Sequence, residues 1–97
     1  MQNLEITPAG YPIYSVDTAP EGSKPVVEAV HKMFGGVVPN LFAVSAISPP
    51  LIAAQATLNQ LVGETSLTNL EVQVIDLAVS RENDCAYCTA AHTFLAR

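Results

Sequence analysis

The sequence has no tryptophan, only four lysine and arginine residues, and no long apolar run. Its net charge is −5, and a chain this acidic is a poor candidate for binding nucleic acid or an anionic membrane surface. No segment approaches the ~18 consecutive apolar residues that a transmembrane helix needs. The segment Met1–Glu5 lacks the basic region of a secretory signal peptide, and no apolar region follows it. These absences favour a cytoplasmic protein without a nucleic-acid or membrane partner.

The chain has 97 residues, of which 49% are hydrophobic, so it can build the core of one small domain. No segment shows the sustained alternation of apolar and polar residues that predicts a strand, and there is no internal repeat. We therefore expect an all-α fold. Residues 1–22 contain Pro8, Pro12 and Pro20 and predict an irregular N-terminal arm that packs on the rest. Residues 23–97 form the expected helical domain.

Start and stop signals divide residues 23–97 into helices. Ser23 can cap a first helix, which has Pro25 in its first turn and stops at Gly35-Gly36. A second helix is expected from Pro39-Asn40 to about Ile47, and a third from Pro50 to near Val62. The phenylalanines at helical spacings are expected in the core, namely Phe34, Phe42 and Phe94. His31 falls on the polar side of the first helix and is expected to be solvated.

The fourth helix has the clearest start, because Thr68 and Glu71 form a capping-box pattern. Apolar residues surround most of this helix, which predicts that it is buried centrally. Its polar residues fall in two groups. One stripe consists of Asn69, Gln73, Asp76 and Ser80, interpreted either as a solvated edge or as part of a site; Glu71 and Glu82 lie roughly opposite. Asp84 is the predicted N-cap of a last helix.

The last helix carries both cysteines and one of the two histidines, in the pattern C-x-x-C-x-x-x-H. Cys88 follows Cys85 by three residues and His92 follows Cys88 by four, so all three side chains lie on one helix face. The positive end of the helix dipole stabilises a thiolate at this end of a helix. A histidine one turn away can take the proton of a nucleophilic thiol, and a second thiol can resolve a sulfenic acid. The pattern indicates a redox or a metal site.

Two other interpretations of these residues remain, and two are excluded. They can be small buried side chains on an alanine-rich helix. They can bind zinc, for which a fourth ligand is needed, and His31 or Asp76 offers one. Covalent haem attachment needs histidine directly after the second cysteine, where Thr89 stands, and thioredoxin-like chemistry needs a βαβ context that is absent here.

The stretch Leu77–His92 resembles the signature of the carboxymuconolactone decarboxylase / alkylhydroperoxidase D-like superfamily. The upstream segments Phe34–Phe42 and Ser48-Pro49 resemble the entry segment of that family, so the likeness covers roughly Phe34 to the C-terminus. It implies an all-α, usually oligomeric protein with a cysteine-dependent peroxidase site. Members continue for further helices after the histidine, so this chain is expected to be a fragment or shortened form that leaves apolar surface for a homo-oligomer partner.

By the resemblance, Cys88 attacks the peroxide, Cys85 resolves the intermediate and His92 relays the proton. The helix dipole alone favours Cys85 as the thiolate, which would exchange the two cysteine roles. A glutamate often completes the relay about three turns before the first cysteine, and Gln73 stands there. Asp76 shares the stripe of Gln73, and Glu82 is a charged residue near the site. Gln73, Asp76 and Glu82 are therefore the candidate relay residues. Tyr87 can lend a hydroxyl or pack at the rim.

The sequence predicts an antioxidant enzyme that reduces peroxides and is restored by a dithiol reductant or redox partner protein. This chemistry requires no organic cofactor and no metal. One alternative is a decarboxylase-like lyase that keeps its turnover without the cysteines. The other is a non-catalytic helical oligomerisation fragment with an inert thiol pair.

Overall fold

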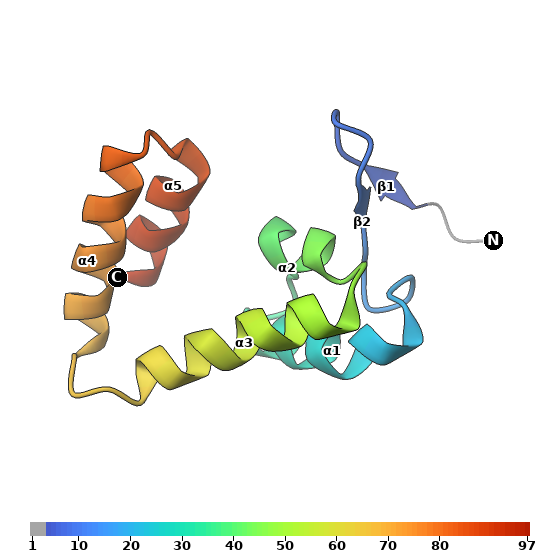
Figure 1. Cartoon of the computed structure of the whole chain (residues 1–97), viewed down its shortest axis with the longest axis horizontal. Helices are drawn as coiled ribbons and strands as arrows, with labels where there is room; N and C mark the ends of the chain where they lie inside the picture. Colours follow the sequence, from blue (N-terminus) through green and yellow to red (C-terminus); the bar gives the residue numbers. More distant parts are fainter. Residues whose placement is uncertain (1–3) are drawn as a thin grey trace. The chain divides into compact units, whose positions relative to one another are not determined.

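The computed structural model describes residues 4–97 and confirms the all-α class (Figure 1). Two short strands, β1 (Glu5–Ile6) and β2 (Pro12–Ile13), pair antiparallel. A 3-10 turn, η1 (Glu21–Ser23), leads into the helices, which are α1 (Lys24–Met33), α2 (Asn40–Ser45), α3 (Pro49–Gly63), α4 (Asn69–Glu82) and α5 (Ala86–Leu95). The chain divides into two compact units, one ending at Leu58 and the other running from Asn59 to Arg97.

The core of the first unit lies between α1, α2 and the start of α3. Its buried residues are Ala19, Val27, Val30, Phe42, Ala46 and Ile52. Phe34 packs against this core with its ring centroid 6.4 Å from that of Phe42, as expected for both. His31 is exposed, which confirms that expectation. Ser23 stands at the N-cap position but does not cap, because its buried hydroxyl donates to the carbonyl of Ala46 at 2.6 Å.

The N-terminal arm belongs to the first unit. The β1–β2 pairing gives it more regular structure than the prolines indicated. The backbone N–H of Tyr14 donates to the carbonyl of Ala43 at 3.0 Å, and the side chains of Tyr14 and Val16 pack against the core. The arm is therefore held by backbone and side-chain contacts, in agreement with the expectation that it packs on the helices.

The predicted helix boundaries hold closely. Gly35 and Gly36 end α1 with positive φ angles of 69° and 101°. Their N–H groups donate to the carbonyls of Lys32 and His31, which is the Schellman pattern of a helix C-terminus. The helix expected from Pro50 to near Val62 is α3, which is one residue longer at each end.

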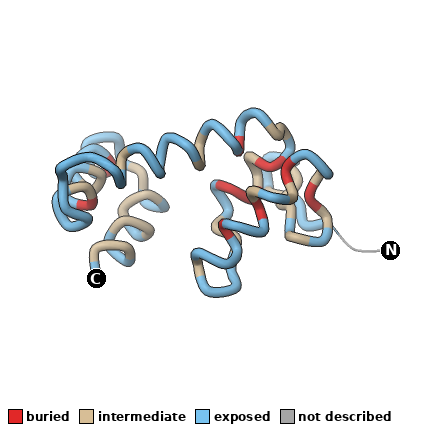
Figure 2. The backbone as a smooth tube through the Cα atoms, turned by 90° about the horizontal axis from the view of Figure 1, so that it is seen from below, coloured by how far each residue is buried: buried red, intermediate tan, exposed pale blue. Residues whose placement is uncertain are grey.

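The second unit is built on the antiparallel hairpin of α4 and α5 (Figure 1). The capping box of α4 is confirmed, since the Glu71 N–H donates to Thr68 Oγ1 at 3.1 Å and the Thr68 N–H donates to Glu71 Oε1 at 2.9 Å. The expectation of a centrally buried α4 is wrong for this chain. Leu70 and Val74 are 59% and 57% exposed, and Figure 2 shows most of this hairpin as exposed or intermediate.

The buried residues of α4 are polar, Gln73 and Ser80. The polar stripe therefore faces α5, and much of the apolar surface of α4 stays exposed, at Leu70, Val74, Ile75 and Val79. Phe94 is also misplaced by the sequence prediction, because 66% of it is exposed. The reason is common to both errors: a two-helix hairpin covers one face of each helix, whichever residues that face carries.

Candidate functional site

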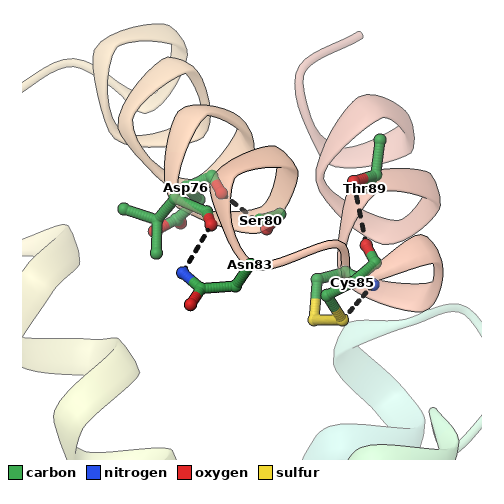
Figure 3. Close-up of a disulfide and its surroundings, with 7 residues drawn as sticks. Asp76, Ser80, Asn83, Cys85 and Thr89 are labelled. Atoms are coloured by element: carbon green, nitrogen blue, oxygen red, sulfur yellow. Dashed lines mark hydrogen bonds between the residues drawn. A yellow bond between two sulfur atoms is a disulfide. The ribbon is translucent and has the colours of Figure 1, made fainter.

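Cys85 and Cys88 form a disulfide at the start of α5, with their Cα atoms 5.3 Å apart. Both side chains are partly buried. Figure 3 shows the disulfide beside the end of α4, and it shows Thr89 donating its hydroxyl to the Cys85 carbonyl, at 2.9 Å. The Cys88 N–H donates to Cys85 Sγ at 3.2 Å. The predicted cysteine pair is thus within bonding distance and lies at the positive end of a helix.

The turn before α5 places Cys85 at the helix N-cap. Asp84 ends α4 with a positive φ of 53°, in the left-handed region that aspartate tolerates better than most residues. The N–H groups of Asp84 and Cys85 donate to the carbonyls of Arg81 and Ser80, which completes a Schellman motif. Asp84 was expected to be the N-cap, and this expectation is wrong. It is used to stop α4, so Cys85 takes the cap position and its sulfur accepts the N–H of Cys88.

His92 lies one turn after Cys88 on α5 and turns one ring nitrogen toward α4. Its Nδ1 is 2.7 Å from Gln73 Oε1 and 3.5 Å from Asp76 Oδ2. The side chains of His92 and Asp76 are 28% and 41% exposed. Because the i and i+4 positions of a helix bring side chains together, His92 is also a neighbour of Cys88 along α5. The site therefore combines a disulfide, an imidazole and a carboxylate.

The structure brings two of the three candidate relay residues to His92. Gln73 and Asp76 both reach the Nδ1 side of His92. Glu82 is exposed at the end of α4, and within residues 4–97 it forms no ion pair with His92. Glu71 stays in the capping box, where the backbone N–H and then the hydroxyl of Thr68 hold the pKa of its carboxyl below the ordinary value. Tyr87 is 48% exposed.

The polar stripe of α4 belongs to the site. Gln73 is 7% exposed and donates through Nε2 to Asn69 Oδ1 at 3.3 Å, and Asn69 Nδ2 donates to the Leu95 carbonyl at 3.1 Å. Ser80 is buried and donates to the Asp76 carbonyl at 2.6 Å, as Figure 3 shows. The sequence signal for these contacts was the stripe itself, but the spacing does not tell whether it faces solvent or another helix.

The described part of the chain contains no group of three or more histidine, cysteine or acidic residues placed to hold a metal ion. His31, one of the suggested zinc ligands, lies on α1 in the first unit, and Asp76 is beside His92 instead. The cysteines occur here as a disulfide, whereas zinc binds thiolates.

Among residues 4–97, no helix has both the length and the apolar content to cross a membrane. A scan against protein-family models finds no match for this sequence, and a search of curated proteins finds none either. The case for a function therefore rests on the residues and their geometry.

Proposed function

We propose that this protein is a peroxide-reducing enzyme of the alkylhydroperoxidase D-like type, with Cys88, Cys85 and His92 as its catalytic residues. The observation that carries the proposal is the disulfide at the start of α5, one helical turn from a histidine bound to α4. A pair of cysteines that can close a disulfide next to a base has the parts for two-electron reduction of a peroxide. In the proposed cycle, a disulfide between these two cysteines is the oxidised state.

In the reduced enzyme, His92 takes the proton of Cys88. The thiolate attacks one peroxide oxygen, so an S–O bond forms as the O–O bond breaks, and His92 returns the proton to the departing alkoxide. Cys85, as a thiolate, then attacks the sulfur of the Cys88 sulfenic acid. The S–S bond forms, the S–O bond breaks, and the hydroxide leaves as water with the proton that the Cys85 thiol gave up. A dithiol reductant supplies two electrons and two protons to restore both thiols.

The roles of the two cysteines rest on different physical effects. Cys88 is closer to His92 along the helix, which favours it as the attacking thiol. Cys85 occupies the N-cap, where its sulfur accepts a backbone N–H, and this contact stabilises a thiolate on Cys85. We assign attack to Cys88 because proton transfer to a neighbouring base is part of the reaction, and the N-cap contact suits Cys85 for the resolving step, which also needs a thiolate.

We also propose that the working form is a cytoplasmic homo-oligomer. Leu70, Val74 and Ile75 lie on α4, Leu67 lies just before its N-cap, and all four are between 41% and 59% exposed. Such a contiguous apolar surface is typical of an interface. A second copy of the chain is the partner that the resemblance implies, and its helices would cover the faces of α4 that α5 leaves open.

The proposal is tested by mixing the reduced protein with one equivalent of hydroperoxide and following thiol loss by alkylation and intact mass. We expect rapid loss of two hydrogens in the parent. Cys88→Ser should lose this fast reaction, whereas Cys85→Ser should consume peroxide once and stop at a sulfenic acid. Exchanged results for the two variants would reverse the cysteine roles. Thiols that react no faster than free cysteine would refute the peroxidase function.

A further inference from the structure

Three side-chain hydrogen bonds connect His92 to the end of its own helix by way of α4. His92 Nδ1 meets Gln73 Oε1 at 2.7 Å, Gln73 Nε2 donates to Asn69 Oδ1 at 3.3 Å, and Asn69 Nδ2 donates to the Leu95 carbonyl at 3.1 Å. We call the side chains of Asn69 and Gln73 the amide chain. Each amide has one donor end and one acceptor end, so the orientation of one determines that of the next.

The Leu95 carbonyl sets the direction of the amide chain. Leu95 is the last residue of α5, where carbonyls lack an intrahelical donor, and a carbonyl can only accept. Asn69 must therefore present its NH₂ group to Leu95 and its oxygen to Gln73. Gln73 must in turn present its NH₂ group to Asn69 and its oxygen to His92. An oxygen that only accepts requires a proton on Nδ1 of His92.

If both amides were reversed, only the contact between Asn69 and the Leu95 carbonyl would become unfavourable. The reversed orientation would still allow a bond between the amides, and the Gln73 NH₂ group could donate to an unprotonated Nδ1. It would place Asn69 Oδ1 against the Leu95 carbonyl, so two acceptors would meet and one bond would be lost. Gln73 is 7% exposed, and buried amides are held in orientations that satisfy their hydrogen bonds. The bond from Asn69 to Leu95 therefore selects the observed orientation.

We propose that Asn69 and Gln73 are positioning residues that hold neutral His92 as the Nδ1–H tautomer, leaving Nε2 as the nitrogen that accepts the thiol proton. The use of Nε2 rests on the peroxide-reducing function proposed above, whereas the tautomer follows from the hydrogen bonds alone. A glutamate at position 73 would have no donor for Asn69 Oδ1. It would also stand one turn from Asp76, whose Oδ2 is 3.5 Å from the same nitrogen. Glutamine leaves Asp76 as the counter-charge when the imidazolium forms.

The tautomer can be measured directly in the reduced, ¹⁵N-labelled protein by correlating the ring nitrogens with the ring protons, at a pH where both imidazoles are neutral. His31 is exposed and serves as the internal reference, expected to show the Nε2–H preference of a free side chain. His92 should instead show a protonated Nδ1 and an unprotonated Nε2. A His92 spectrum with the proton on Nε2 would overturn the inference.

Two substitutions at Asn69 test the role of the amide chain without removing Gln73. Asn69→Ala removes the group that fixes the orientation of the Gln73 amide, so His92 should become a mixture of tautomers. The rate constant for peroxide reduction should fall about tenfold, the effect of one hydrogen bond. Asn69→Asp still accepts from Gln73 Nε2 and should keep the Nδ1–H tautomer and most of the rate. Gln60→Ala, which removes a surface amide bonded to Glu64 at 3.2 Å, is the matched control.

The outcomes separate this inference from the proposed function. A pure Nδ1–H tautomer in both the parent and Asn69→Ala would overturn the role of Asn69. The expected tautomer pattern in a protein that reacts with peroxide no faster than free cysteine would refute the peroxidase function and leave the tautomer assignment standing. A rate constant that falls in the Asn69 variant that loses the Nδ1–H tautomer, and not in the variant that keeps it, would support both the tautomer inference and the proposed function.

Discussion

His92 Nδ1 lies 2.7 Å from the side-chain oxygen of Gln73, a residue 19 positions earlier on the neighbouring helix. This contact crosses the interface between α4 and α5, and under our proposal it determines which nitrogen of His92 is left to accept the proton of Cys88. It also accounts for an amide at a position where the resemblance suggested a carboxylate. In the proposed mechanism the amide is an oriented acceptor, and the nearby carboxylate of Asp76 supplies the negative charge.

Replacing His92 should slow the reaction and spare the fold. We expect His92→Gln to lower the rate constant for peroxide reduction roughly 100-fold, because the reaction loses its positioned base. The rate is measured by stopped-flow thiol oxidation. His31→Gln is the matched control, since His31 is exposed on α1, and it should react like the parent. Equal rates for the two variants would remove His92 from the mechanism.

Reduction of the disulfide should weaken the second unit. Closing so short a loop between Cys85 and Cys88 constrains the unfolded chain, and we expect it to contribute about 2 kcal/mol to the free energy of unfolding. Urea unfolding of the oxidised and reduced protein, followed by circular dichroism, measures the difference. The double variant Cys85→Ser, Cys88→Ser should be insensitive to reductant. A loss of stability on reduction that persists in this variant would contradict the assignment to the disulfide.

The capping box makes the stability of α4 depend on Thr68 and on pH. Thr68→Ala should lower the free energy of unfolding by about 1 kcal/mol, because an N-cap acceptor is lost. Hydrogen bonds from the Thr68 backbone and hydroxyl lower the pKa of Glu71 below its ordinary value of 4.5. Their contribution is therefore complete above the ordinary pKa and is lost as the pH falls through the lower pKa of the folded state.

Thermal unfolding of the parent and Thr68→Ala between neutral and acid pH checks this dependence. The difference in unfolding temperature between the two proteins should shrink toward acid pH as Glu71 is protonated. Thr93→Ala is the matched control, because Thr93 is exposed on α5 and its hydroxyl bonds to the carbonyl of Thr89 within the helix. A difference that grows toward acid pH would have the wrong sign.

Asp84 holds a left-handed backbone conformation between α4 and α5. Asp84→Ala should destabilise the protein by about 1 kcal/mol, whereas Asp84→Gly should be neutral or stabilising, because only glycine lacks the steric penalty at positive φ. Chemical denaturation of the parent and both variants measures the order of their stabilities. Equal destabilisation by alanine and glycine would indicate that the aspartate side chain itself, and not the backbone angle, is required.

The exposed apolar residues of α4 predict self-association. Val74 is 57% exposed, and Val74→Lys should shift the sedimentation of the protein toward monomer at micromolar concentration by placing a charge in the interface. Met33→Lys is the matched control, because Met33 is 76% exposed on α1 in the first unit. A monomeric parent protein, or equal effects of the two variants, would contradict an interface on α4.

Local sequence patterns predicted the helices well because helix starts and stops depend on nearby residues. Thr68 with Glu71, and Gly35 with Gly36, define boundaries through hydrogen bonds within a few residues. The role of Asp84 was harder to predict, because aspartate is common both at a helix N-cap and in the left-handed conformation that ends a helix. The turn uses it as a stop, and a cysteine becomes the cap.

The sequence by itself determined the all-α class, most of the helix boundaries and the placing of Cys88 and His92 one turn apart on the last helix. These follow from spacing and from short-range hydrogen bonds. Tertiary structure alone decided which stripe of α4 meets α5, and with it the contacts of Gln73, Asp76 and Asn69. Helical periodicity groups residues on a face, but it does not say what that face contacts. The choice depends on how the two helices pack, and here the polar stripe became the buried one.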